Sequence, residues 1–223
     1  MPALTLTDNH PDDGDHPVLF ENISRDLLLK GYSINPYALP LGLAEELWQH
    51  LQQMPNTAFA NAGIGRQQAY SRNGFVRSNL IAWIQDDCPA EQHWLQWATG
   101  LQSYLNRRLF LGLFSFESHF AHYATGDFYK RHLDAFKGQA NRVISLIVYL
   151  NRDWNPSDGG ELMLYQPAAD QDPLRVTPTF GTVVAFLSED FPHEVLPARR
   201  DRYSIAGWYR LNSSHPERVD PPS

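Results

Sequence analysis

Turn signals divide the second half of the chain into short segments rich in β-branched and aromatic residues, and this pattern constrains the fold most. Gly, Asp and Thr mark the turns, as in the DGG sequence at 158–160. Strands are expected at 115–123, 129–135, 142–151, 161–166, 175–177, 182–187, 193–196 and 202–211. Eight strands at this spacing are typical of a jelly-roll barrel, also called a double-stranded β-helix. A two-sheet sandwich of another topology is the alternative.

The first half of the chain has a helical pattern. Helices are expected at 20–31, 41–54 and 89–109, with a short strand at 32–34. In the second helix, Leu43, Leu47 and Leu51 recur at every fourth position beside Trp48, which predicts one buried stripe. The third helix is expected to place five residues on its inner face: Trp94, Trp97, Leu101, Tyr104 and Leu105. The fold class is therefore mainly β with flanking helices (α+β), a barrel supported by N-terminal helices.

The length of 223 residues and the 43% hydrophobic content predict one main domain. We place this domain at 18–213, between an acidic flexible tail at 1–17 and a polar C-terminal tail at 214–223. The segment 61–73 is rich in Gly, Asn, Arg and Gln without an apolar period, and it is expected to form a long binding loop.

Charge and cysteine content exclude several classes. A formal net charge of −7 argues against binding to nucleic acid. No apolar run reaches the roughly 18 residues that a membrane span needs, so a cytoplasmic protein is expected. Cys88 is the only cysteine, which excludes an intrachain disulfide. Because Asp86 and Asp87 disfavour its thiolate, Cys88 is interpreted as a small residue at a helix start.

His132 and Asp134 lie two residues apart in an expected strand. Side chains at this spacing point to the same face, so the pair could chelate one metal ion. His193 begins a later expected strand and is the candidate third ligand. Two imidazoles and one carboxylate leave positions open for dioxygen and a cosubstrate, as in non-haem iron(II) oxygenases. The same ligand set also accepts manganese or cobalt.

Arg202 follows a polar turn at 199–201. A hairpin through this turn is expected to return Arg202 alongside the strand that carries His193. A guanidinium in that place could bind a carboxylate through two parallel hydrogen bonds, which an ammonium group could not do.

Five segments carry a family resemblance: YKRHLD at 129–134, VYLNRDW at 148–154, GGEL at 159–162, PHEV at 192–195 and RYSIAGWY at 202–209. They resemble the prolyl hydroxylases that act on hypoxia-inducible factor and their bacterial relatives. The similarity is strong from 123 to 209 and fainter upstream, where RSNLIAWI at 77–84 still matches. The loop at 61–73 differs from that of the animal enzymes, so animal hypoxia factor is not implied as the target.

The resemblance implies roles by position. His132, Asp134 and His193 would bind iron(II), and Arg202 with Tyr149 would hold the distal carboxylate of 2-oxoglutarate. The positions that match walls of the cosubstrate pocket are Tyr123, Tyr129, Ile147, Leu162 and Trp208. The positions expected to contact the peptide substrate are Arg77, Trp83, Tyr129 and Arg142. Core packing is the alternative for the wall residues, and a solvated surface charge is the alternative for Arg142.

The resemblance also implies an activity. It predicts hydroxylation of a proline in a loop of a protein substrate, with succinate and carbon dioxide as coproducts. Iron(II), 2-oxoglutarate and dioxygen would be required, with ascorbate as a further candidate. Elongation factor Tu is the candidate target among bacterial relatives. The alternatives are a dioxygenase of a free amino acid or another small molecule, and a non-catalytic module that senses metal or 2-oxoglutarate.

The other histidines are interpreted without a metal. His119 and His122 are three residues apart in an expected strand, so they should point to opposite faces and serve packing. The remaining histidines are expected to lie in tails or on helices without a partner at ligand spacing: His10, His16, His50, His93 and His215. No GxSxG, P-loop, GxGxxG helix start or HExxH motif is present, so hydrolase, nucleotide and zinc-protease functions have no support.

Overall fold

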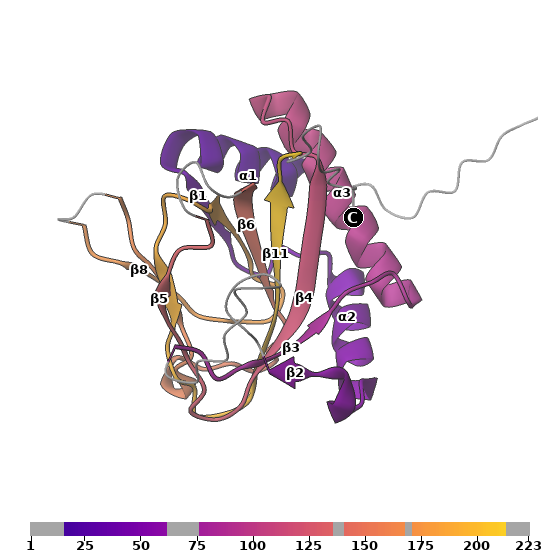
Figure 1. Ribbon diagram of the computed structural model, residues 1–223, viewed down its shortest axis with the longest axis vertical. Coiled ribbons are helices and arrows are strands. Elements are labelled where there is room, and N and C mark those ends of the chain that lie inside the picture. The colour runs from indigo at the N-terminus through magenta and orange to yellow at the C-terminus, as the bar shows by residue number, and fades with distance from the viewer. Residues whose placement is uncertain (1–15, 62–75, 136–140, 168–170, 213–223) are drawn as a thin grey trace, which may run out of the picture.

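Two antiparallel sheets face one another, and three helices cover the outer side of the larger sheet (Figure 1). The structure is a computed structural model, and it describes residues 16–61, 76–135, 141–167 and 171–212. The expected tails lie largely outside the described residues, as does the expected binding loop apart from its first residue, Asn61. The prediction of a mainly β chain with supporting N-terminal helices is confirmed.

The larger sheet has the strand order β1-β9-β6-β11-β4-β3-β2. Its strands are β1 (Tyr32–Asn35), β2 (Ala60–Asn61), β3 (Leu80–Trp83), β4 (Ser115–Tyr123), β6 (Arg142–Tyr149), β9 (Val183–Leu187) and β11 (Arg202–Arg210). The smaller sheet has the order β5-β10-β7-β8. Its strands are β5 (Tyr129–His132), β7 (Leu162–Leu164), β8 (Leu174–Val176) and β10 (His193–Val195). From β4 onward the chain therefore passes repeatedly from one sheet to the other.

The helices are α1 (His16–Lys30), α2 (Leu41–Gln53) and α3 (Pro89–Leu109), and short 3₁₀ turns occur at η1 (Asn56–Ala58) and η3 (Pro156–Asp158). α3 has the predicted bounds because Pro89 suits the first helical turn and Phe110 ends the helix in a left-handed conformation, with φ 55°. In α2 the fully buried positions are Ala44, Leu47 and Leu51, so Leu43 is less buried than predicted. None of the described helices is long and apolar enough to cross a membrane.

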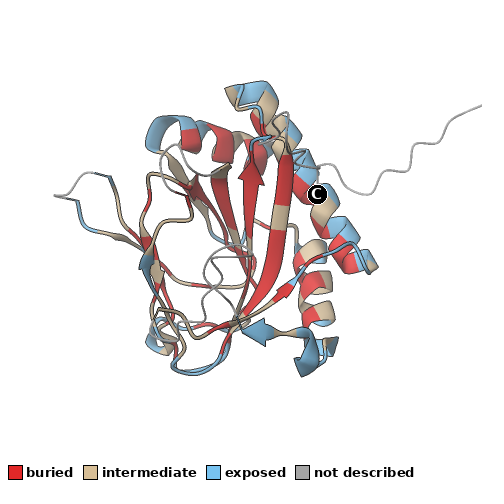
Figure 2. Ribbon diagram, in the orientation of Figure 1, coloured by how far each residue is buried: buried red, intermediate tan, exposed pale blue. Residues whose placement is uncertain are grey.

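The strands of the larger sheet separate two hydrophobic cores. On β4, Phe120 packs in the core beneath the helices, whereas Ala121 and Tyr123 belong to the core between the two sheets. On β6, Val148 and Tyr149 divide in the same way. Figure 2 shows buried residues along nearly the whole length of β4 and β11. A strand buried on both faces holds its side chains in fixed positions.

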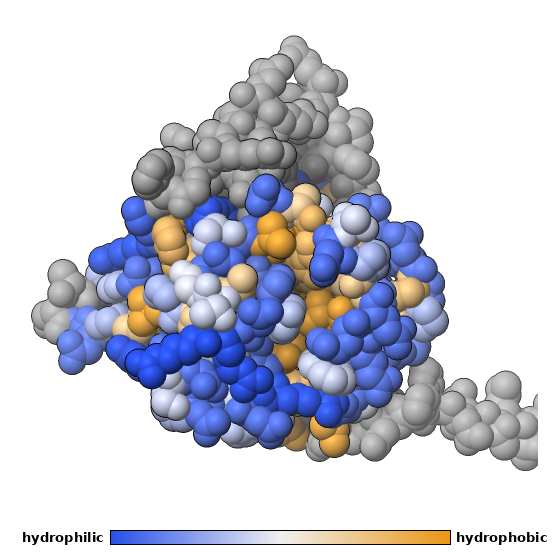
Figure 3. Space-filling model, turned by 90° about the horizontal axis from the view of Figure 1, so that it is seen from below, coloured by the Kyte–Doolittle hydropathy of each residue, from blue (hydrophilic) through white to orange (hydrophobic). Residues whose placement is uncertain are grey.

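The surface follows from this burial. Seen from below in the orientation of Figure 1, hydrophilic side chains dominate the described surface and apolar ones form patches between them (Figure 3). The exposed large apolar side chains include Leu28 and Leu29 on α1 and Phe110 at the end of α3. Scattered apolar residues of this kind are normal for a folded chain.

Gly207 on the central strand β11 leaves no room for a side chain. A Cβ there would lie 2.5 Å from the ring of Phe116 and 2.9 Å from the Cβ of Ser118. Gly207→Ala should therefore lower the free energy of unfolding by about 1–3 kcal/mol through overpacking. Gly42→Ala on α2 is the matched control, because a Cβ added at Gly42 would have no heavy atom within 4 Å. Urea unfolding should show that Gly42→Ala leaves the free energy of unfolding unchanged or raises it by up to about 1 kcal/mol. Equal losses of stability in the two variants would contradict the close packing around Gly207.

Candidate metal centre and cosubstrate pocket

His132, Asp134 and His193 converge in the space between the sheets. The two histidines are direct partners across the β5–β10 pair, so backbone hydrogen bonding sets the distance between them. Their Nε2 atoms each lie 3.6 Å from a carboxylate oxygen of Asp134. Ligand atoms of all three residues lie within 4.8 Å of one another, which is close enough to hold one metal ion.

The local reason for this convergence differs from the expected one. β5 ends at His132, so Asp134 lies beyond the strand and not on its continuing face. Its position comes from a strand of the other sheet, since the Ser145 hydroxyl on β6 donates a 2.7 Å hydrogen bond to Asp134 Oδ2. No sequence signal pointed to Ser145, because the contact joins the two sheets.

Both histidines are held in the tautomer that suits a metal ligand. His132 Nδ1 lies 2.8 Å from the carbonyl oxygen of Lys130, and His193 Nδ1 lies 3.1 Å from that of Phe191. Because a carbonyl can only accept, each Nδ1 carries the proton and each Nε2 keeps its lone pair free. Backbone carbonyls of this kind orient many metal-bound histidines.

Burial and charge keep these groups in their metal-binding forms. Burial lowers the pKa of His193 to about 4, so the ring is neutral at pH 7. Burial would raise the pKa of Asp134, but His193, His132 and the Ser145 hydroxyl outweigh it and hold that pKa well below its usual range. The centre therefore presents one carboxylate and at least one neutral imidazole.

Arg202 reaches the core between the two sheets by a different route from the one predicted. The expected hairpin is wrong: β10 belongs to the smaller sheet, while β11 lies between β4 and β6 in the larger one. The segment between them crosses from one sheet to the other. Arg202 is the first residue of β11, opposite Tyr123 of β4, and its side chain is among the largest that are fully buried.

The Arg202 guanidinium lies in a cradle of neutral groups. Its Nε donates a 2.8 Å hydrogen bond to the carbonyl oxygen of Gly160, and its Cζ lies 5.0 Å from the ring centres of both Tyr123 and Tyr149. Gly160 has a positive φ of 69°, and a Cβ there would lie 3.2 Å from Arg202 Cδ and 2.8 Å from the Cβ of Ala198. Only glycine allows this close approach.

Two polar groups of this cradle lack a matching partner among the described residues. No carboxylate pairs with the buried Arg202, and the buried Tyr149 hydroxyl has no hydrogen-bond partner. Burial raises the pKa of Tyr149 to about 12, so this hydroxyl stays protonated and can donate. A carboxylate inserted here would meet a guanidinium and a phenol together. These residues therefore fit the distal end of a small diacid.

Comparison with known proteins agrees with this geometry. The family model of the 2OG-Fe(II) oxygenase superfamily matches residues 118–210. A crystal structure of a Pseudomonas putida prolyl-4-hydroxylase is 35% identical, covers 86% of this chain and 99% of its own, and superimposes with a TM-score of 0.78. The chain belongs to the 2OG-Fe(II) prolyl hydroxylase family. The family recognition and the jelly-roll prediction are thereby confirmed.

Two further relatives show how much of the chain is similar to known proteins. A Trichoplax adhaerens prolyl hydroxylase, solved with a hypoxia inducible factor peptide fragment, is 28% identical, covers 87% of this chain and 90% of its own, and has a TM-score of 0.76. Egl nine homolog 1 of Homo sapiens is 35% identical over 85 residues, which are 38% of this chain and 20% of that protein. The matched region thus spans about a fifth of that curated relative.

The walls expected from the family lie around the centre. Tyr129 stacks on the His132 ring with 3.5 Å between ring centres, and the Arg77 guanidinium lies 4.3 Å from the Tyr129 ring centre on β5. The core between the sheets also contains three of the expected wall residues, Tyr123, Ile147 and Leu162. Trp208 lies farther along β11, opposite Ser145 of β6. The expected wall residues are therefore aromatic and aliphatic side chains that lie mainly in the core between the sheets.

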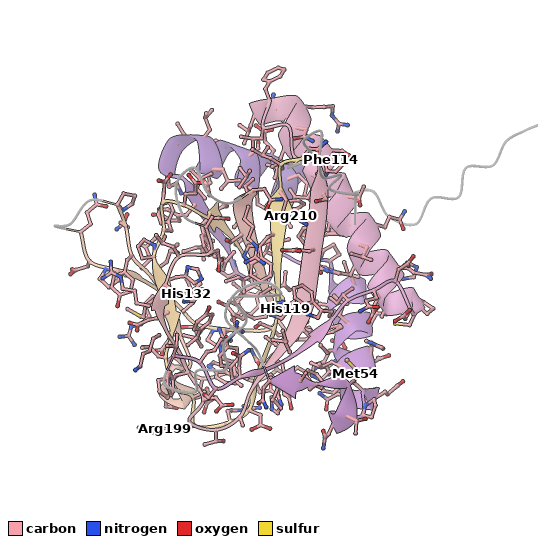
Figure 4. The ribbon with its side chains drawn as sticks, in the orientation of Figure 1. Met54, Phe114, His119, His132, Arg199 and Arg210 are labelled. Atoms are coloured by element: carbon pink, nitrogen blue, oxygen red, sulfur yellow. The ribbon has the colours of Figure 1, made fainter. Side chains whose placement is uncertain are left out.

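Two of the residues expected to contact substrate, Trp83 and Arg142, lie against the neighbouring rings of His119 and Trp208 on the larger sheet. Arg142 is not a solvated charge: it lies 2.8 Å from Glu117 and its Cζ lies 3.7 Å from the Trp208 ring centre. Trp83 is 48% exposed and packs edge-on against His119, with ring centres 5.1 Å apart. His119 and His132 come from opposite sheets in Figure 4, on either side of the space between them.

The remaining histidines mostly follow the sequence interpretation. His119 is buried beside Trp208, whereas His122 points to the helical side and stacks on Tyr203, so the prediction of opposite faces is confirmed. His93 pairs with Glu46 at 2.8 Å. One expectation is wrong: His50 does have partners at ligand spacing, which come from a distant part of the chain.

His119 should make stability depend on pH. Burial lowers its pKa to about 3, with smaller contributions from Arg77 and Arg142, and its Nδ1 finds no hydrogen-bond partner in the described part of the chain. An unfolded histidine titrates near pH ~6.5, so the unfolded state binds the proton first as pH falls. The free energy of unfolding should therefore fall as the pH is lowered from ~6.5 toward ~3. The expected fall between pH ~7 and ~4 is on the order of 3 kcal/mol.

Urea unfolding at several pH values should measure this loss. His119→Gln should flatten the dependence of the unfolding free energy on pH relative to the parent chain. The control is His93→Gln, since the side chain of His93 is 56% exposed on α3. Parallel curves for the parent and His119→Gln would show that His119 is not held neutral by burial.

Proposed function

We propose that this chain is an iron(II)- and 2-oxoglutarate-dependent dioxygenase that hydroxylates a prolyl residue in a protein substrate. The single observation that carries the proposal is the buried Arg202 guanidinium beside the unpartnered Tyr149 hydroxyl, next to a group of two histidines and one aspartate within the described residues. Together these residues suit a metal ion and a diacid bound at the same time.

His132, Asp134 and His193 would hold the iron. Three protein ligands on one side leave the remaining positions for the cosubstrate and dioxygen. When bound, iron and 2-oxoglutarate together supply the oxidising chemistry, with succinate and carbon dioxide as coproducts. The chain itself selects the tautomer of both rings, because the carbonyls of Lys130 and Phe191 accept from Nδ1 and leave the lone pair of the neutral imidazole on Nε2. Ascorbate is a candidate reductant that would restore oxidised iron.

Arg202 and Tyr149 would hold the far carboxylate of 2-oxoglutarate. Anchoring this end fixes the other end of the molecule toward the metal, which is the main contribution a protein makes to such chemistry. Leu162, Ile147 and Tyr123 would line the chain of the diacid and keep water away. The neutral cradle around Arg202 leaves its charge available for the carboxylate.

A protein substrate is supported by the relatives and by the exposed edge of the site. The Trichoplax enzyme was solved with a peptide fragment of hypoxia inducible factor. In this chain Trp83 is exposed, and the guanidinium groups of Arg77 and Arg142 lie over the rings of Tyr129 and Trp208, which offers aromatic and cationic groups for a proline-containing loop. Elongation factor Tu is the target that we would test first, on the family resemblance.

Succinate release provides the test. The purified chain is incubated with iron(II), 2-oxoglutarate, ascorbate and elongation factor Tu, and peptides of the factor are searched by mass for one added oxygen on proline. Stimulated release with an oxidised proline is the expected result. Release stimulated only by the low-molecular-mass fraction of a cell extract would favour a small-molecule dioxygenase, and binding without any release would favour a sensing module. Asp134→Ala, which lacks a proposed ligand, is the inactive control.

Arg202→Lys should raise the KM for 2-oxoglutarate by about 10- to 100-fold, because an ammonium group cannot make the paired hydrogen bonds. Tyr149→Phe removes one neutral hydrogen bond and should raise it by only about 2- to 10-fold. The kcat at saturating cosubstrate should change less than KM in both variants. Unchanged KM values in steady-state assays would contradict the assignment of this end of the pocket.

A further inference from the structure

A second group of side chains that could hold a metal ion lies outside the proposed active centre. His50 on α2, Cys88 at the start of α3 and Glu91 on α3 place their ligand atoms within 4.8 Å of one another. The ring of His50 packs on the helical side of the larger sheet, with its centre 5.7 Å from that of Phe120. The sheet therefore separates this group from His132, Asp134 and His193.

The distance between His50 and Glu91 matches a metal site better than a hydrogen bond. His50 Nε2 lies 3.5 Å from Glu91 Oε1, and Cys88 Sγ lies 3.5 Å from His50 Nδ1 and 3.8 Å from His50 Nε2. A nitrogen-to-oxygen hydrogen bond is normally about 2.7–3.2 Å long, so the first distance is too great for a good one. With zinc bond lengths of about 2.0–2.3 Å, a tetrahedral site separates nitrogen from oxygen by about 3.4 Å and from sulfur by about 3.5 Å.

Glu91 is arranged so that one of its oxygens is available. Its Oε2 accepts hydrogen bonds from the backbone amides of Gln85 and Asp87, at 3.0 and 3.2 Å. Oε1 faces His50 instead. These amides fix the carboxylate in a side chain that is 7% exposed, whereas the His50 side chain is 25% exposed and leaves a path for an ion. The loop 85–87 thus positions a carboxylate whose other oxygen is directed toward His50.

We propose that His50, Cys88 and Glu91 bind one thiophilic divalent cation of the zinc class, with solvent as the fourth ligand. Thiolate and imidazole together select zinc over magnesium or calcium. A cysteine that coordinates a metal ion binds it as the thiolate, so one thiolate and one carboxylate would neutralise the divalent charge. The ion would join the last turn of α2 to the first turn of α3, residues 38 positions apart in the chain.

Cobalt(II) alone is the probe that separates this site from the proposed iron centre. A cobalt–thiolate bond gives a charge-transfer band in the near ultraviolet, and Cys88 is the only cysteine of the chain. The centre of two histidines and one aspartate cannot produce that band. The reduced full-length chain is titrated with cobalt, both as the parent and with Asp134→Ala, which weakens the iron centre.

The expected result is a charge-transfer band that saturates at about one cobalt per chain, survives Asp134→Ala and disappears on addition of zinc. Cys88→Ser should abolish the band. Glu91→Gln and His50→Ala should weaken cobalt binding by more than the roughly 10- to 100-fold that loss of an outer-shell partner costs. Zinc should raise the Tm of Asp134→Ala, and Cys88→Ser in that background should remove this shift.

His93→Gln is the matched control, because His93 lies on the same helix pair but bonds to Glu46 outside the group. It should leave cobalt binding unchanged. Absence of the band in a parent chain that melts cooperatively would overturn the proposal. So would a band that saturates at half an equivalent, which means bridging between two chains, or a band that Glu91→Gln and His50→Ala leave unaltered.

Discussion

The uncompensated charge of Arg202 is the constraint on which the rest of the site depends. A guanidinium without an anion in a protein interior costs several kcal/mol, and the described residues supply it only with a carbonyl, a hydroxyl and two aromatic faces. Two features hold the guanidinium in this place. Gly160 has a positive φ and no side chain that would block Arg202, and β11 lies in the middle of the larger sheet between β4 and β6. The interior is thereby prepared for an anion that the described residues do not provide.

Local signals in the sequence were sufficient for most elements. Pro89 and the spacing of Trp94, Trp97 and Leu101 predicted α3 with correct bounds, and the aromatic-rich segment 115–123 predicted β4 equally well. The placement of β10 and β11 in different sheets was not predictable in this way. A polar turn between two strands suggests a hairpin, but which sheet each strand joins is decided by contacts between distant parts of the chain.

The residues that converge at the candidate site were predictable from the sequence, but the contacts that position them were less so. The HxD spacing, a later histidine and Arg202 could be read from the chain because each belongs to a motif. Ser145, the carbonyl of Gly160 and the pairing of Arg142 with Glu117 could not, since each joins segments that are well separated in sequence. The cluster at His50 was missed for the same reason, because a helix end and a later helix start bring it together.

The pairing of His132 with His193 across β5 and β10 determines the geometry of the candidate metal centre. Backbone hydrogen bonds, not a bound ion, determine how far apart these two rings lie, and the adjoining carbonyls already fix their tautomers. The conformational entropy of the two histidine side chains is therefore lost when the sheets form, and not when an ion binds. If these residues hold iron as proposed, the ion would enter a site whose geometry the two strands have already set.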